Sequence, residues 1–210
     1  FQTFANRDLR QYRNLSMYLH AENNIKTPFG IKDKDLNAVI RIGTDFVNNY
    51  YEIKIPLYLT PLSVSSLNPD SDAYNDSLWR AINNLDVDLT VLTKLKQERN
   101  FCASCPSTSM YRQVQPNGQT YSIMGEPNLG EIRGVLISVE NVNNLNACGE
   151  VWANELRLTS IDEKGGWAAM GRVDMTLADL GTISASISTH SQGFGTLEQR
   201  ANDRYRDDYK

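Results

Sequence analysis

Residues 51–60 decide the fold class, and they read Tyr51-Glu52-Ile53-Lys54-Ile55-Pro56-Leu57-Tyr58-Leu59-Thr60. The odd positions hold Tyr, Ile, Ile, Leu and Leu, while the even positions hold Glu, Lys, Pro, Tyr and Thr. This two-residue period is typical of a β-strand with one buried face, because successive side chains of a strand point to opposite faces. Pro56 has no N–H to donate, so we expect the strand to lie at a sheet edge or to carry a bulge.

Two segments upstream show the same alternation. Residues 15–22 and residues 36–42 each place aliphatic side chains at every second position. Residues 44–49, Thr-Asp-Phe-Val-Asn-Asn, have the Asp and Asn content of a turn. We therefore expect residues 36–60 to form an antiparallel pair of strands.

Further strands are expected downstream. The turn Gln115-Pro116-Asn117-Gly118 predicts a hairpin of residues 111–114 and 120–124. Residues 132–140 are almost continuously apolar, which favours a central strand covered on both faces. Residues 150–158 follow, and a strict period of two sends Trp152, Leu156 and Leu158 to one face.

Little helix is expected. Residues 62–76 have the composition of a loop, and residues 77–84 are expected to form a short helical turn. Asp88 predicts the N-cap of a helix that runs to about Arg99. Roughly seven or eight strands without βαβ alternation indicate an all-β fold, an antiparallel β-sandwich over residues 1–160. Within that class we favour a jelly roll of the galactose-binding-like kind.

From residue 161 the pattern changes. Residues 167–189 form two longer alternating segments around the turn Asp179-Leu180-Gly181, with Trp167 at the start. Strands of about 10 residues with one apolar face and an aromatic end resemble the wall of an outer-membrane barrel. The alternative is an ordinary amphipathic hairpin that packs on the sandwich. Residues 200–210 carry mixed charges, and we expect them to form a solvated tail.

The composition excludes some functions. The 210 residues include 21 Lys and Arg and 25 Asp and Glu, which gives a formal net charge of −4. Such a chain lacks the basic footprint of nucleic-acid binding, so nucleic acid is not an expected partner. No run approaches the roughly 20 consecutive apolar residues of a membrane-spanning helix. The chain starts at Phe1, and we expect it to be a segment of a longer protein.

The chain has three cysteines, an odd number that cannot all pair internally. Cys102 and Cys105 form a C-x-x-C pair, but it follows a predicted helix instead of opening one, which disfavours a thioredoxin-type redox site. We expect loop cysteines with one possible disulfide, between Cys148 and either Cys102 or Cys105.

No catalytic motif is found, and the two histidines have no nucleophile pattern around them, so we do not expect an enzyme. Carbohydrate-binding jelly rolls end in an apolar-aromatic strand that can hold a structural calcium ion together with an early glutamate. The run from Val151 to Leu158 resembles such an ending, which makes Glu22, Asn154 and Glu155 calcium candidates. No other cofactor is expected. Trp79 and Tyr50 are the candidates for stacking on a sugar.

Five runs of residues resemble, in order, motifs of the SprA/Sov family. They are Gly125-Glu-Pro-Asn-Leu-Gly-Glu-Ile-Arg-Gly134, Gly149-Glu-Val-Trp-Ala-Asn-Glu-Leu-Arg-Leu158, Lys164-Gly-Gly-Trp-Ala-Ala-Met-Gly-Arg-Val-Asp174, Leu177-Ala-Asp179 and Gly193-Phe-Gly-Thr-Leu-Glu-Gln-Arg200. Weaker similarity covers residues 14–60.

The resemblance implies a segment of the outer-membrane translocon of the type IX secretion system, which exports folded cargo in Bacteroidetes and supports gliding motility. It implies a location in the cell envelope, with the sandwich periplasmic or extracellular and residues 167–189 in contact with the membrane. The implied partners are other components of that system and exported cargo. A carbohydrate-binding module of a cell-surface protein, with a glycan as ligand, is the alternative function.

Overall fold

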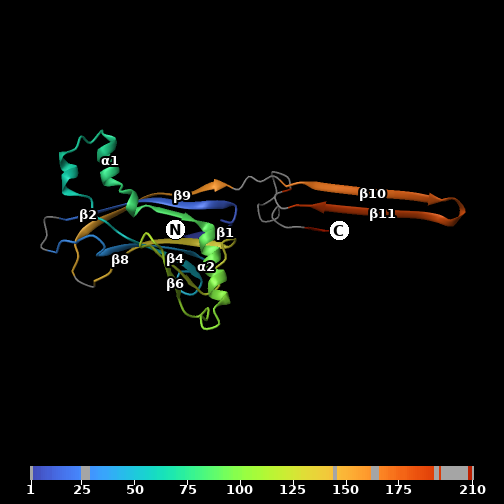
Figure 1. The fold of residues 1–210 in the computed structure, drawn as a ribbon, viewed down its shortest axis with the longest axis horizontal. Helices are drawn as coiled ribbons and strands as arrows, with labels where there is room; N and C mark the ends of the chain where they lie inside the picture. Colours follow the sequence, from blue (N-terminus) through green and yellow to red (C-terminus); the bar gives the residue numbers. More distant parts are fainter. Residues whose placement is uncertain are drawn as a thin grey trace. The chain divides into compact units, whose positions relative to one another are not determined.

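The computed structural model describes residues 2–24, 29–143, 146–161, 166–191, 194 and 208–209. The chain divides into two compact units, Phe1–Ile161 and Asp162–Lys210. The first unit holds both sheets of the sandwich, and the second holds the C-terminal hairpin (Figure 1).

Two antiparallel sheets form the first unit. The larger sheet has the strand order β1 (Gln2–Arg7), β8 (Ile132–Asn141), β3 (Leu36–Gly43), β4 (Tyr50–Pro56), β7 (Thr120–Met124) and β6 (Tyr111–Val114). The smaller sheet has the order β5 (Leu85–Asp88), β2 (Tyr12–Asn23) and β9 (Gly149–Ile161). All pairs of these strands are antiparallel, which confirms the expected antiparallel β-sandwich class. The jelly-roll arrangement within that class stays a prediction.

The core lies where the inner faces of both sheets supply aliphatic side chains. Ile40 and Ile53 are directly opposite each other in the larger sheet, and both are fully buried. Leu19 of β2 is equally buried and belongs to the same cluster. The expected pairing of residues 36–60 is confirmed as β3 and β4. The alternation predicts these strands because one face of each is removed from water.

Pro56 lies at neither a sheet edge nor a bulge of its strand. β4 runs between β3 and β7, so it is internal, but the β7 pairing stops at Lys54. Pro56 is the last residue of β4 and is opposite Asn37 of β3. A missing N–H is tolerated there because the neighbouring strand has already ended.

The helix predicted from Asp88 is confirmed as α2 (Leu89–Phe101), and Asp88 Oδ1 accepts a 2.9 Å hydrogen bond from Thr90 N. Leu89, Leu92 and Leu95 of α2 are buried in the core cluster. The expected loop and helical turn before it instead contain η1 (Leu62–Ser66), α1 (Asp72–Leu78) and η2 (Ala81–Asn83). Ser71 caps α1 by accepting a hydrogen bond from Tyr74 N. Within the described ranges, no helix has both the length and the apolar character needed to cross a membrane.

Two expectations about side-chain direction are wrong. The apolar strand β8 is central in its sheet, but Ile137 and Val139 remain 36% and 48% exposed, so it is not covered on both faces. In β9 the register against β2 shifts between Ser16 and Tyr18, where Glu155 adopts a positive φ of 57°. This β-bulge reverses the alternation, so Trp152 pairs with His20 on the outer face while Leu158 pairs with Leu15 on the inner face.

The second unit is a long hairpin. β10 (Ala168–Leu177) pairs with β11 (Gly181–His190) through the short η3 turn (Ala178–Leu180), as the alternation predicts. Within the expected solvated tail, β12 (Asp208–Tyr209) instead pairs with β11. The rest of that tail, residues 200–207 and 210, lies outside the described residues, as do Lys164, Gly165, Gly193 and residues 195–199 of the motif runs.

Candidate functional site

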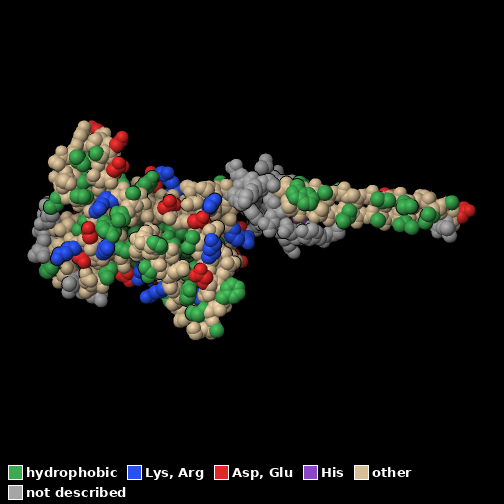
Figure 2. Space-filling model, in the orientation of Figure 1, with side chains coloured by type: hydrophobic (Ala, Val, Ile, Leu, Met, Phe, Trp, Pro, Cys, Tyr) green, Lys and Arg blue, Asp and Glu red, His purple; other side chains and the backbone are tan. Residues whose placement is uncertain are grey.

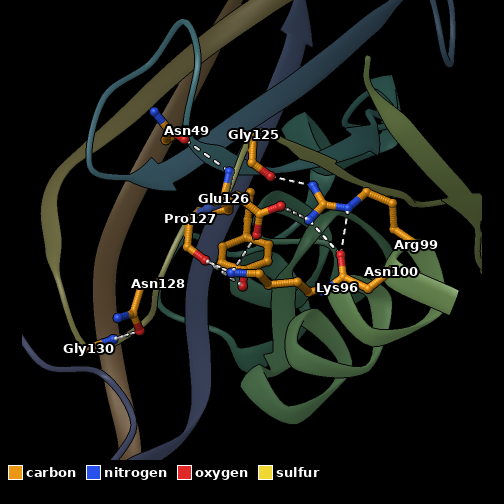
Figure 3. Close-up of polar contacts among 10 residues, drawn as sticks. Asn49, Lys96, Arg99, Asn100, Gly125, Glu126, Pro127, Asn128 and Gly130 are labelled. Carbon is orange, nitrogen blue, oxygen red and sulfur yellow. Dashed lines mark hydrogen bonds and ion pairs between the residues drawn. The ribbon is translucent and has the colours of Figure 1, made fainter. Parts of the chain in front are cut away.

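A network of polar side chains surrounds the loop of residues 125–130, between β7 and β8. This loop belongs to the first of the five motif runs. Helix α2 reaches it from one side and the β3–β4 turn from the other (Figure 3). We call this network, made by Asn49, Lys96, Arg99, Asn100 and residues 125–130, the loop clamp.

Arg99 is the centre of the loop clamp. Its side chain is only 1% exposed, and burial of a guanidinium is costly unless its donors are paired. Arg99 donates to the carbonyl oxygen of Gly125, to Glu126 Oε1 at 2.7 Å and to Asn100 Oδ1 at 2.8 Å. The guanidinium therefore joins the last turns of α2 to the start of the loop.

Lys96 adds a second link one helical turn earlier. Its Nζ lies 3.1 Å from Glu126 Oε2 and donates a 2.9 Å hydrogen bond to the carbonyl oxygen of Pro127. The two carboxylate oxygens of Glu126 thus face different cations. Because Lys96 and Arg99 are three residues apart, they lie on the same side of the helix.

The β3–β4 turn holds the other side of the loop. Asn49 Oδ1 accepts a 2.9 Å hydrogen bond from Glu126 N. Gly125 adopts a φ of +68°, and a Cβ there would lie 1.8 Å from the backbone oxygen of Asn48. Only glycine fits, both because of the positive φ and because the turn approaches so closely.

Tyr51 of β4 also contacts the loop. Its hydroxyl donates a 3.3 Å hydrogen bond to the carbonyl oxygen of Pro127. Burial raises the pKa of Tyr51 to about 12, so the hydroxyl stays protonated at neutral pH. The cations are paired and the phenol is neutral. The loop clamp therefore suits a structural role, in which it fixes three segments to one another.

From the sequence, Arg99 was placed only at the end of a predicted helix, and Lys96 was not singled out as a site residue. A stronger signal was present in the helix period. Arg99 follows Leu92 by seven residues and Leu95 by four, which places it on the buried face of α2. A cation on an apolar face predicts a buried partner.

The calcium candidates are not brought together. Glu22 is opposite Glu150 in the β2–β9 ladder, whereas Asn154 is opposite Tyr18, four residues away. At about 3.3 Å per residue this separation is roughly 13 Å, too far for shared coordination. Glu155 occupies the bulge and is paired with Arg157. The described residues contain no group of three or more His, Cys, Asp or Glu that could hold a metal ion.

The two sugar-stacking candidates lie in different surroundings. Tyr50 is only 5% exposed, and the guanidinium carbon of Arg41 lies 4.4 Å from its ring centroid, so its ring is not open for stacking on a sugar. Trp79 is half-buried and packs edge-to-face on Tyr18, with ring centroids 6.3 Å apart. Trp79 also covers His20, whose ring centroid is 5.8 Å away. Of the two, only Trp79 remains near an exposed aromatic surface.

The disulfide prediction is also wrong. Cys102 pairs with Cys105, and Cys148 is a free cysteine. The two partners are three residues apart in the turn that ends α2, where Cys105 N donates to the carbonyl oxygen of Cys102. Cys148 lies before β9, where it forms a bridge with Gly30.

Comparison with known proteins agrees with the motif runs. No curated protein matches the chain. A family model described as motility related/secretion protein, SprA_N, matches residues 3–210. This match spans the sandwich, the loop clamp and the hairpin, and it confirms the resemblance to the SprA/Sov family. The chain therefore belongs to the SprA_N family of motility-related secretion proteins.

Proposed function

We propose that the chain is a structural, non-catalytic segment of a large outer-membrane translocon, the protein-secretion channel of the type IX secretion and gliding-motility system. Its family gives a role in motility and secretion. The observation that supports the finer assignment is the separation of apolar from polar side chains on the β10–β11 hairpin.

The register of the hairpin sorts its side chains into two faces. On one face Val173 is opposite Ala185, and Met175 is opposite Ile183. On the other face Arg172 is opposite Ser186. The apolar face also contains Ala169, Gly171, Leu177 and Ile187, with Thr189 near its end, and the polar face also contains Asp174, Thr176, Thr182, Ser184 and Ser188, with Ala168, Met170 and His190 at the end next to Trp167.

The apolar face has no cover from the residues described. Val173 is 58% and Ile187 is 67% exposed, and hydrophobic side chains lie at the surface along the hairpin (Figure 2). Apolar surface left in water costs about 25 cal/mol per Å², and a lone two-stranded hairpin is marginally stable in water. The face therefore needs an apolar environment.

The dimensions of the hairpin fit a bilayer. β10 and β11 are each 10 residues long, within the roughly 9–11 residues that a tilted membrane strand requires. Trp167 precedes β10 and is 60% exposed, which is the position of an interfacial aromatic in barrel proteins. Lipid would cover the apolar face, and the polar face would point toward the lumen.

The sandwich fits the envelope side of this proposal. The Cys102–Cys105 disulfide is of the kind that persists in oxidising compartments such as the periplasm or the cell surface. The buried cation of the loop clamp is paired, which supports a scaffold and not a reactive centre. Other components of the secretion system and exported cargo are the partners that follow from this role.

Fractionation of cells tests the proposal. We expect the full-length protein that carries this segment, with an epitope tag and its own promoter, to sediment with the outer membrane. We also expect deletion of its gene to stop secretion of the cargo of the system. A protein found wholly in the cytosol would contradict the outer-membrane assignment.

Glycan binding is the second candidate function, because Trp79 packs beside Tyr18, which is 42% exposed. A pair of aromatic rings at a surface can stack on a sugar. Glycan-array binding by the purified chain, lost in Trp79→Ala, would favour this function. A flat array would remove it.

A further inference from the structure

The smaller sheet ends in an unpaired strand edge. Among the described residues β9 pairs with β2 alone, whereas β2 lies between β5 and β9 (Figure 1). From Gly149 to Asn154 the ladder with β2 is regular, and the bulge at Glu155 ends this regular part. Bulges protect strand edges against further pairing. The part of β9 before the bulge, residues 149–154, is therefore the part whose edge remains open to another strand.

Inner-face side chains next to this edge are not covered. In the larger sheet, Ile40 is fully buried, whereas Ile137, directly opposite it on β8, is 36% exposed. Ala38 is 1% exposed and Val139, opposite it, is 48% exposed. The facing sheet therefore stops before it covers this part of β8.

The same drop in burial occurs across the smaller sheet. Leu19 of β2 is fully buried, but Ala153, opposite it on β9, is exposed. Residues 142–148 link the end of β8 at Asn141 to the start of β9 at Gly149, so these two strand ends lie within reach of a seven-residue connection. In sheets packed face to face, a strand beside β9 would cover the inner face of β8.

The outer face at this edge is acidic and aromatic. Glu22 and Glu150 lie directly opposite each other, and like charges in this position destabilise the pair. His20 Nε2 lies 3.4 Å from Glu22 Oε2, and Glu150 has no ion pair within the described part of the chain. Trp152, next to Glu150 on the same face, is 57% exposed. A cation from outside would relieve the repulsion, and it could also contact the face of the indole ring.

We infer that this edge binds an extended segment of a partner protein, which adds to the smaller sheet as a fourth strand beside residues 149–154. The segment has aliphatic side chains on its inner face, over Ile137 and Val139, and a lysine or arginine on its outer face, beside Glu150 and Trp152. Main-chain hydrogen bonds supply affinity, and the alternating side chains supply specificity. This inference does not depend on the translocon proposal.

Charge favours a different protein over a second copy of this chain. The regular edge reads Gly149-Glu-Val-Trp-Ala-Asn154 and contains no Lys or Arg. Self-pairing of that edge would therefore bring no Lys or Arg to the Glu22–Glu150 pair. The protein as a whole is also acidic, with a formal net charge of −4.

Selection from a displayed library of random nonapeptides on the purified 210-residue chain tests the inference. We expect the enriched peptides to alternate aliphatic and polar residues and to carry Lys or Arg at a polar position. Hydrogen exchange of the amides of residues 150–154 should slow when an enriched peptide is bound. Absence of enrichment, or enriched peptides without this pattern, would overturn the inference.

Three variants locate the site. Ala153→Lys points a charge inward from the edge, which blocks strand addition, and we expect it to abolish binding. Thr159→Lys makes a lysine substitution on the same strand beyond the bulge, and it should bind as the wild type does. Glu150→Lys should weaken the binding of a lysine-containing peptide by about fivefold. It should strengthen the binding of the same peptide with glutamate in place of that lysine. Equal binding to all variants, or a dimer of the chain that Ala153→Lys dissociates, would contradict a partner strand at this edge.

Discussion

Arg99 donates a 2.7 Å hydrogen bond to Glu126 Oε1, and the two side chains differ in exposure, with 1% of Arg99 and 56% of Glu126 open to solvent. The buried charge of the loop clamp is thus neutralised by a carboxylate at the surface. Loss of the surface partner can be compensated by water, whereas loss of the buried cation leaves the Gly125 carbonyl oxygen without its donor.

Arg99→Met should therefore destabilise the sandwich more than Lys96→Met does. We expect Arg99→Met to lower the free energy of unfolding by about 2–4 kcal/mol, because the carbonyl oxygen of half-buried Gly125 loses its donor and the link from α2 to the loop is lost. Lys96 is partly exposed, so its loss should cost about 0–1 kcal/mol. Urea unfolding followed by near-ultraviolet circular dichroism measures both, and equal losses would contradict the central position of Arg99.

Gly125→Ala should be far more damaging than Gly118→Ala. Both glycines have a positive φ, but a Cβ at Gly118 meets nothing within 4 Å, whereas one at Gly125 overlaps the backbone of Asn48. We expect about 1 kcal/mol for Gly118→Ala from backbone strain alone. Gly125→Ala adds the cost of moving the turn, about 3 kcal/mol or more in total. Thermal unfolding measures the loss of stability in each variant. The difference between the two losses is the cost of the overlap with the Asn48 backbone.

The β3–β4 turn should weaken in acid. Asp45 accepts hydrogen bonds from the backbone N–H of Asn48 and from the side chain of Asn49, which lower its pKa. A carboxyl whose pKa is lowered by folding stabilises the protein above its unfolded pKa of about 3.9 and loses that contribution as the pH falls further. Asp45→Asn should make stability less dependent on pH below about 4. An unchanged acid profile in that variant would show that Asp45 contributes nothing.

Thiol counting tests the cysteine pairing. The unfolded chain should take up one equivalent of maleimide before reduction, at Cys148, and three after reduction, because Cys102 and Cys105 are joined. Mass spectrometry of a digest made without reduction should find Cys148 in an unlinked peptide. A peptide that links Cys148 to either of the others would refute the assignment.

The hairpin faces can be compared with neighbouring substitutions on β11. Ala185 lies on the apolar face and Ser186 on the polar face. If lipid covers the apolar face, Ala185→Arg should cost about 2–4 kcal/mol near the middle of the bilayer, while Ser186→Arg should be tolerated. The readout is the amount of full-length protein in the outer membrane, together with cargo export. Equal tolerance of both changes would show that neither face contacts lipid.

Local chemistry was enough to predict several elements. The helix start at Asp88, the hairpin around residues 115–118 and the pairing of β3 with β4 depend on a cap, a turn and an alternation within a few residues. Each of these signals acts over short distances along the chain, so the amino-acid order alone contains it. The resemblance in the motif runs likewise identified the family.

Long-range contacts decided the rest. One residue in a left-handed conformation, Glu155, reversed the directions expected for Trp152 and Leu158, because a bulge shifts the two-residue period. Tyr50 is buried through its packing with Arg41, and the alternation at the strand start could not show this. The partner of Arg99 is 27 residues away.

By itself, then, the sequence determined most of the strands, though not β1, β5 or β12, and it determined where α2 begins and to which family the chain belongs. Only the tertiary structure decided which strand edge stays open, which cysteines pair and which charge is buried. The reason is physical: periodicity and capping are properties of neighbouring residues, whereas burial and pairing depend on which segments meet after the chain has folded.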